Sequence, residues 1–191
     1  MWILLSIIAV ASVLILASCQ ATRGGYESAP YQVVRASGKF EVRDYPALQV
    51  VETPMANANG SDGSFMRLFR FITGANEAKQ KIAMTTPVFM SGGDSNATMT
   101  FVLPTKLSAE AVPKPSDGAV KVRELPAGRF AVLRFSGSRN AKHDAAALER
   151  LRAWMQAEEL KELAPPVYGY FDPPWTPGLL RRNEVMVRAE K

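Results

Sequence analysis

The sequence predicts an α+β protein built from two similar β-β-α-β-β halves, with eight strands and two helices. Residues 42–47 (VRDYPA) and 122–127 (VRELPA) match at an offset of 80 positions, with four of six residues identical and an acid at a fifth position. The order of the predicted elements around the two segments also repeats. Because one helix leaves part of each half's sheet uncovered, we expect the halves to pair as a pseudo-twofold domain with a groove or pocket between them.

The first predicted helix covers residues 64–73. Asp62 or Ser64 can cap its start, and Gly74 can cap its end. Apolar residues at positions i, i+3, i+4 and i+7 form one stripe along it, which predicts that the helix packs against the sheet. The residues of this stripe are Phe65, Leu68, Phe69 and Ile72.

The second predicted helix covers residues 138–163, and Pro165 and Pro166 end it because proline cannot continue a helix. Charged residues supply its solvent face. The residues expected to face inward are Leu148, Leu151, Trp154 and Met155.

Alternating apolar residues bounded by turn signals predict the strands. Pro87 is expected to place its strand at a sheet edge or a bulge, because proline has no backbone N–H. Residues 104–118, rich in proline and glycine, are expected to link the halves. The predicted strand segments are 31–45 with a turn at Ser37-Gly38, 48–53, 81–90, 98–103, 120–123, 128–135, the segment around Tyr168 and Tyr170, and 184–188.

Composition limits the function classes. The chain of 191 residues is 47% apolar and 21% charged, which suits a globular protein with a sizeable core. The net charge of +5 is spread without a run of five like charges, so the sequence does not predict a nucleic-acid surface. One cysteine and one histidine are too few for a zinc site, and no metal site is expected.

The N-terminus reads as a secretion signal. Residues 2–17 are almost wholly apolar, but they are shorter than the roughly 20 residues that a membrane span needs. They end in LASC, with Cys19 last, which resembles the lipobox of bacterial lipoproteins. An uncleaved anchor with an incidental cysteine is the alternative. No lysine or arginine precedes the apolar run, which departs from the usual pattern of such signals.

This interpretation divides the chain into a signal peptide (1–18), a polar tether (19–30) and a folded domain (31–191) with halves at about 31–104 and 119–191. Cys19 is the predicted lipidation site. Gln20, which follows it, favours the outer membrane of a Gram-negative cell, so a periplasmic lipoprotein of the cell envelope is expected.

Five motifs carry a wider resemblance. The most specific are DPPW at 172–175 and RRNEV at 181–185, followed by KIAMTTPV at 81–88, EVRDYP at 41–46 and GAN at 74–76. From about residue 31 to its end, the chain resembles the SOUL haem-binding protein family. The resemblance implies a distorted eight-stranded antiparallel β-barrel flanked by two helices, a fold similar to that of GyrI-like small-ligand domains.

The same resemblance implies that haem or a related tetrapyrrole binds reversibly in a hydrophobic cleft beside the first helix, as in a carrier or scavenger. Phenylalanine and methionine can cover a porphyrin's apolar faces, and arginine can pair with its propionates. For the apolar candidates, the alternative is a place in the core. The candidate binding residues are Phe65, Met66, Phe69, Arg70, Met84, Phe89, Tyr168 and Arg181, with Arg67 and Arg182 as further propionate partners.

The iron ligand stays open. His143, the only histidine, is expected at the polar start of the second helix, among Lys142 and Asp144, which makes it a weak candidate. Met66, Met84 and Tyr168 are the other candidate ligands, and binding without a side-chain ligand is a further possibility.

Other functions stay open beside haem binding. One alternative is a general binder of hydrophobic or cationic small molecules, as GyrI-like domains can be. A pocket lined with aromatic residues and a buried glutamate, such as Glu184, would favour it. An enzyme would use Glu184 with Tyr168 or Tyr170 as acid and base. The sequence contains no Ser-His-Asp set, and Cys19 belongs to the lipobox, so we expect no enzyme. An envelope interaction protein without a ligand is the last alternative. For residues 181–184 (RRNE), the alternative to ligand binding is an ion-pair and hydrogen-bond cluster that fixes the hairpin.

Overall fold

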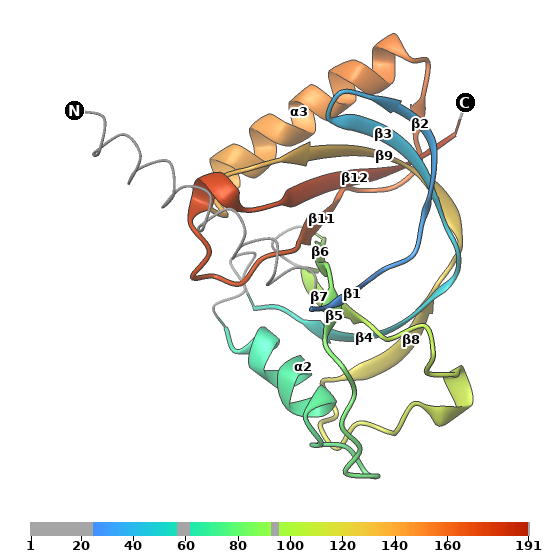
Figure 1. The fold of residues 1–191 in the computed structure, drawn as a ribbon, viewed down its shortest axis with the longest axis vertical. Helices are drawn as coiled ribbons and strands as arrows, with labels where there is room; N and C mark the ends of the chain where they lie inside the picture. Colours follow the sequence, from blue (N-terminus) through green and yellow to red (C-terminus); the bar gives the residue numbers. More distant parts are fainter. Residues whose placement is uncertain (1–24, 57–61, 93–95, 191) are drawn as a thin grey trace, which may run out of the picture.

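One curled antiparallel sheet of ten strands organises the fold (Figure 1). The structure, a computed structural model, describes residues 25–56, 62–92 and 96–190. The predicted signal peptide and Cys19 lie outside these residues. A separate parallel pair is formed by β1 (Glu27–Ser28) and β5 (Thr85–Thr86). The ten strands are β2 (Gln32–Ser37), β3 (Phe40–Tyr45), β4 (Leu48–Pro54), β6 (Val88–Ser91), β7 (Thr98–Val102), β8 (Lys121–Leu125), β9 (Gly128–Phe135), β10 (Lys161–Glu162), β11 (Val167–Tyr170) and β12 (Asn183–Glu190).

The strand order confirms the predicted duplication. It runs β2-β3-β9-β12-β11-β6-β7-β4-β8, with β10 beside β12. A pseudo-twofold axis between β11 and β6 exchanges these two strands, and likewise β12 with β7, β9 with β4, and β3 with β8. The predicted α+β class and the eight duplicated strands are therefore present. In the described part of the chain β2 and β8 end the order without pairing with each other, so the curled sheet is a half-barrel.

The first duplicated strand of each half pairs inside the other half. β3 belongs to the first half but pairs with β9 of the second, from Phe40 opposite Leu133 to Tyr45 opposite Gly128. β8 belongs to the second half but pairs with β4 of the first, from Leu125 opposite Leu48 to Lys121 opposite Glu52. This exchange interlocks the two halves.

Two helices cover opposite ends of one sheet face, as Figure 1 shows. α2 (Ser64–Ile72) packs on β4 and β7, and α3 (Ala141–Ala157) packs on β9 and β12. Neither helix in the described residues is long and apolar enough to cross a bilayer. One row of cross-strand neighbours links their two core clusters, so both helices lie on the same face. This row is Leu133, Val185, Tyr168, Met90 and Met99.

The other face lines the inside of the curl. Its core cluster contains residues from both ends of the sheet, among them Tyr45, Val50, Phe89, Val132 and Met186. Because neighbouring residues of a strand point to opposite faces, the two faces receive separate sets of side chains. The central strands β11 and β6 lie between the two helices.

The predicted end of α2 at Gly74 is supported, but the N-cap residue is Gly63 rather than Asp62 or Ser64, and the buried side of the helix differs from the prediction. Asp62 Oδ1 accepts a hydrogen bond from the Ser64 N–H at 3.0 Å. Gly74 adopts φ +115°, and the next N–H bonds to the Arg70 carbonyl at 2.8 Å, which closes the helix as a Schellman motif. The buried apolar residues are Leu68, Phe71 and Ile72, whereas the predicted Phe65 and Phe69 are partly exposed.

The prediction for the second helix was too long. α3 begins after Asn140, whose side chain accepts a hydrogen bond from the Lys142 N–H at 2.8 Å. It ends at Ala157, because the chain turns through Glu159 at φ +57° and joins the sheet as β10. An ion pair of 2.9 Å between Arg152 of α3 and Glu162 of β10 holds this return.

The edge position predicted for the Pro87 strand was also wrong. β6 is central, between β11 and β7. Pro87 precedes β6 and lies between it and β5, so no N–H from this position is needed in the sheet.

Candidate ligand-binding groove

A groove runs over β11 and β6, between the two helices. It consists of three adjoining cavities, which we name the α2 cavity (about 380 Å³), the middle cavity (about 420 Å³) and the α3 cavity (about 440 Å³). Phe65, Val88 and Tyr170 line both the α2 and the middle cavity, and Met90, Arg139 and Tyr170 line both the middle and the α3 cavity. Each volume lies in the range of small-molecule sites.

The α2 cavity is mainly apolar. The rings of Phe65 and Phe69 stack with centroids 5.9 Å apart, and Phe65 also packs edge-on against Phe101 at 5.2 Å. Met66 and Met84 lie beside these rings. The motif DPPW at 172–175 and Tyr26, near the start of the described chain, complete the lining.

The side of α2 that faces this cavity is unusually apolar for an exposed surface. Phe65, Met66 and Phe69 are 37%, 46% and 38% exposed, although Leu68, Phe71 and Ile72 on the adjacent side of the same helix already pack in the core. A cluster of three large apolar side chains beside a cavity is typical of a surface that is covered by a ligand or a partner.

The α3 end of the groove is polar. The Tyr170 hydroxyl donates to Asp144 Oδ2 at 2.9 Å, and the Arg139 guanidinium lies 5.1 Å from the centre of the Tyr170 ring. Asp144 Oδ1 is buried and has no hydrogen-bond partner among the described residues. Burial raises the pKa of Asp144 above its ordinary value, although Tyr170, Arg139 and His143 oppose this shift. A ligand group that donates a hydrogen bond would suit this end.

Arginines flank the middle cavity. Arg139 and Arg181 both line it. Arg181 also fixes the preceding loop, because its Nε donates to the Thr176 carbonyl at 2.7 Å and its Nη2 donates to the Pro174 carbonyl. Asp172 lines the same cavity, so the groove passes from an apolar end to a region of charged side chains of both signs.

The structure brings most of the predicted binding residues to this groove. Phe65, Met66, Phe69 and Met84 line the α2 cavity, Phe65 and Arg181 the middle cavity, and Tyr168 the α3 cavity. The other arginines lie elsewhere. Arg70 is exposed and lines none of the described cavities, Arg67 bonds to Thr53 and to the Pro54 carbonyl, and Arg182 bonds to Glu184.

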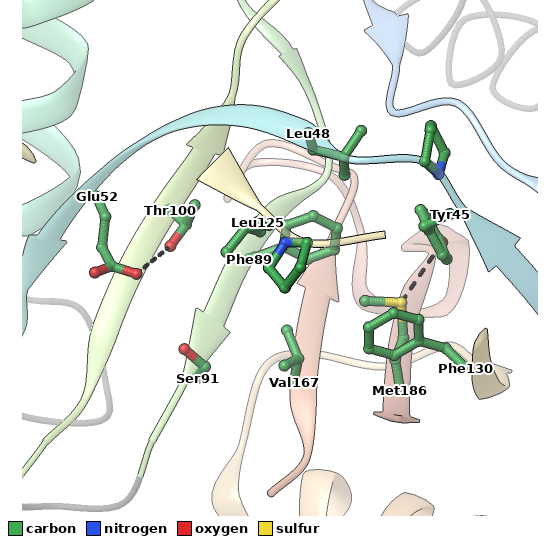
Figure 2. A pocket seen from close by; sticks show the side chains of 12 residues that line it. Tyr45, Leu48, Glu52, Phe89, Ser91, Thr100, Leu125, Phe130, Val167 and Met186 are labelled. Carbon is green, nitrogen blue, oxygen red and sulfur yellow. Dashed lines mark hydrogen bonds between the residues drawn. The ribbon is translucent and has the colours of Figure 1, made fainter. Parts of the chain in front are cut away.

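Phe89 points to the opposite face. It lines a small cavity of about 90 Å³ inside the curl, together with Tyr45, Phe130, Val167 and Met186 (Figure 2). The Tyr45 hydroxyl donates to Met186 Sδ at 3.6 Å there. Phe89 is 5% exposed and therefore belongs to the core, which was the alternative to a ligand contact for this residue.

Glu184 also lies inside the curl, in a buried ion cluster. Its carboxylate accepts hydrogen bonds from Arg43 at 2.7 and 3.0 Å and from Arg182 at 2.6 and 3.0 Å. Burial opposes ionisation of Glu184, but the two arginines hold its pKa below the ordinary 4.5. Gly169 is its partner on β11, so Tyr168 and Tyr170 point to the other face. Glu184 and these tyrosines therefore do not form one acid–base site.

The candidate iron ligands are separated. Met66 and Met84 share the α2 cavity, whereas Tyr168 lies in the α3 cavity, where its hydroxyl donates to the Asp144 carbonyl at 3.4 Å. His143 Nδ1 lies 3.4 Å from the Ser138 carbonyl oxygen, and its ring lines none of the described cavities. The two methionines are therefore the candidates beside the stacked phenylalanines.

Sequence reasoning missed Arg139 and Asp144 as groove residues. They lie at the start of α3, which the pseudo-twofold axis relates to the start of α2. Since Phe65 and Phe69 were already assigned to the groove, the duplication was the signal that could have assigned the start of the second helix to it too.

Known structures with the same fold are distant in sequence. The C-terminal domain of EcmrR matches with a TM-score of 0.57 and 15% identity, covering 84% of this chain and 98% of that domain. A hydrolase from Listeria innocua matches with a TM-score of 0.61 and 8% identity, covering 82% and 94%. An uncharacterised conserved protein from the same organism matches with a TM-score of 0.60 and 11% identity, covering 80% and 92%. These likenesses show a shared GyrI-like fold.

No curated protein matches the sequence of this chain. The family model described as SOUL heme-binding protein matches residues 26–188, which include both helices, all three cavities and the motifs at 172–175 and 181–185. The chain is therefore a member of the SOUL heme-binding protein family.

Proposed function

We propose that the protein binds haem or a related tetrapyrrole reversibly in the groove and acts as a lipid-anchored carrier or scavenger in the cell envelope. The observation that carries the proposal is the exposed apolar side of α2, formed by Phe65, Met66 and Phe69, at the wall of a cavity of about 380 Å³. Membership of a haem-binding family supports a flat, apolar ligand there.

The residues of the groove fit the chemistry of a porphyrin. The stacked rings of Phe65 and Phe69 offer a flat apolar wall, and Met66 and Met84 add polarisable sulfur atoms that can approach iron. Arg139 and Arg181 line the adjoining cavity and can pair with propionates. Haem here is the cargo, and a groove that is open to solvent suits a carrier that releases it.

A titration with hemin tests this function. The full chain should show a saturable shift of the Soret band. Met66→Ser should weaken binding about tenfold, equivalent to about 1.4 kcal/mol, because the variant removes part of the apolar wall. Val34→Ser is the matched control, since Val34 is 51% exposed on β2 and lines none of the described cavities. Absorbance that grows without saturation, or equal weakening in both variants, would contradict the proposal.

One observation favours a second candidate, a binder of flat hydrophobic cations. The pocket carboxylate would be Asp144, whose buried Oδ1 has no partner among the described residues, rather than Glu184, which is paired with arginines. Ethidium can test this alternative. If ethidium binds the full chain more tightly than hemin, and Asp144→Asn weakens only ethidium, the cation binder is the better description.

Lipid anchoring through Cys19 is part of the proposal and is tested separately. Mass spectrometry of the protein purified from a bacterial envelope should show an acylated Cys19 at the N-terminus of the mature chain. A Cys19→Ser variant should lose the acyl groups and leave the membrane fraction.

A further inference from the structure

The connection between β11 and β12 holds two large apolar side chains out into solvent beside the groove. Trp175 is 79% exposed and Leu179 is 89% exposed, the highest values among the large apolar residues of the described chain. Trp175 also lines the α2 cavity. Trp175 therefore extends the apolar surface of Phe65, Met66 and Phe69 at the mouth of the groove, and Leu179 adds a second exposed apolar side chain on the same connection.

This connection is firmly held. Arg181 donates to the carbonyls of Pro174 and Thr176, and the Thr176 N–H bonds to the Pro173 carbonyl at 3.0 Å. The Gly137 N–H bonds to the Gly178 carbonyl at 2.9 Å, which ties the connection to the segment before α3. The exposure of Trp175 and Leu179 is therefore built into the fold.

The start of the described chain lies at the same mouth. Tyr26 lines the α2 cavity together with Trp175. The strand that follows it is fixed, because the Glu27 carboxylate accepts hydrogen bonds from Thr105 at 2.7 and 2.8 Å and the Ala29 N–H bonds to the Thr86 carbonyl at 2.8 Å. The N-terminal tether therefore reaches the folded domain at the rim of the groove.

The length of this tether limits the distance to the membrane. Cys19 is seven positions before Tyr26, so even a fully extended chain between them spans at most about 25 Å. A lipid on Cys19 would keep the mouth of the groove within that distance of the bilayer. Tryptophan is enriched at membrane interfaces, and apolar side chains on one surface strengthen the attachment of an anchored protein.

We infer that the connection between β11 and β12, through Trp175 and Leu179, rests on the lipid bilayer, so that the groove opens onto the membrane and exchanges its ligand directly with it. The inference rests on the lipid anchoring in the proposed function.

Two single-tryptophan forms of the full chain test the orientation. Trp2→Phe with Trp154→Phe leaves Trp175, and Trp2→Phe with Trp175→Phe leaves Trp154. Trp154 is stacked on Phe40 at 5.1 Å and lies about 20 Å along α3 from the groove end of that helix, so it serves as the internal control.

Both forms are reconstituted into phosphatidylethanolamine–phosphatidylglycerol vesicles with and without brominated acyl chains. We expect bromolipid to reduce the emission of Trp175 roughly twofold and to leave that of Trp154 nearly unchanged, because only an interfacial tryptophan meets the bromine atoms. Trp175 emission that stays red-shifted and open to aqueous iodide on vesicles would overturn the inference. If Trp175 is already protected from aqueous iodide before vesicles are added, the inference is also overturned. A second copy of the chain or another protein would then cover this surface.

Leu179→Ser tests the exchange, because Leu179 lines none of the described cavities. Its hemin affinity in solution should equal that of the wild type, while hemin transfer from loaded vesicles should be several-fold slower. If hemin binds and Trp175 is not quenched, the orientation alone is wrong. If the full chain does not float with vesicles, the anchoring in the proposed function is wrong as well.

Discussion

Arg43 and Glu184 lie inside the curled sheet, both fully buried, and are joined by two hydrogen bonds of 2.7 and 3.0 Å. Burial alone would lower the pKa of Arg43, but the Glu184 carboxylate raises it above the ordinary value, so both groups stay charged. The pair joins β3 to β12 across β9. Removing either partner leaves a buried charge with fewer compensating contacts.

Glu184→Ala should therefore lower the free energy of unfolding by about 3–5 kcal/mol. Urea unfolding followed by circular dichroism measures this loss. Arg129→Ala is the matched control, because Arg129 also bonds to a carboxylate on β3, Asp44 at 2.8 Å, but both of those side chains are exposed. The control should change stability little. Similar losses in the two variants would show that burial of the Arg43 pair does not decide its contribution.

The same carboxylate should make stability depend on acid pH. The folded-state pKa of Glu184 lies below its ordinary 4.5, so its contribution is fully present above that value and is lost as the pH falls through the folded pKa. Between about pH 5 and pH 3 the wild type should lose stability more steeply than Glu184→Gln. Urea midpoints at several pH values measure both slopes, and equal slopes would contradict this assignment.

At the scale of single elements, α2 shows what a sequence pattern can and cannot predict. Its position and its end at Gly74 followed from the pattern, because both depend on residues of the helix and its flanks. Its orientation did not, because two apolar sides compete on one short helix. The sheet receives Leu68, Phe71 and Ile72, and the groove receives Phe65 and its neighbours. Only the positions of β4 and β7 decide which side is buried.

The end of α2 provides a test of its own. Gly74 has φ +115°, a conformation that side chains rarely adopt, so Gly74→Ala should destabilise the protein by about 1–3 kcal/mol. Gly118→Ala is the control, because Gly118 has no left-handed φ and an added Cβ there would meet nothing within 4 Å. Thermal unfolding of both variants measures the difference. A control that is as destabilised as Gly74→Ala would point to a cause other than backbone conformation.

At the scale of the whole molecule, the duplication could be predicted from the matching segments 42–47 and 122–127, but the exchange of first strands could not. A repeat shows that two halves are alike and does not show which half each strand joins. The partner of Glu184 was hidden for the same reason, because Arg43 is 141 positions away in the chain. The groove was predicted between the halves, but its polar end was not. That end depends on the contact between Asp144 of α3 and Tyr170 of β11, which are 26 positions apart in the chain.

The strand exchange predicts that neither half folds by itself. A protease site inserted within residues 105–118 should yield two fragments that stay together on gel filtration and separate only in urea. Either fragment produced alone should lack a cooperative unfolding transition, because β3 and β8 would have lost their partners β9 and β4. A cooperative transition in an isolated half would contradict this expectation.

The place of β12 in the sheet also bears on the order in which the domain folds. β12 is the last strand of the described chain, yet it lies between β9 and β11 and beside β10, near the middle of the sheet. Pairing between residues so far apart is slow to form. The sheet therefore cannot be completed until this strand has paired. Until then β9, β10 and β11 each keep an edge whose backbone N–H and C=O groups are unpaired, and such open edges favour aggregation of a partly folded chain.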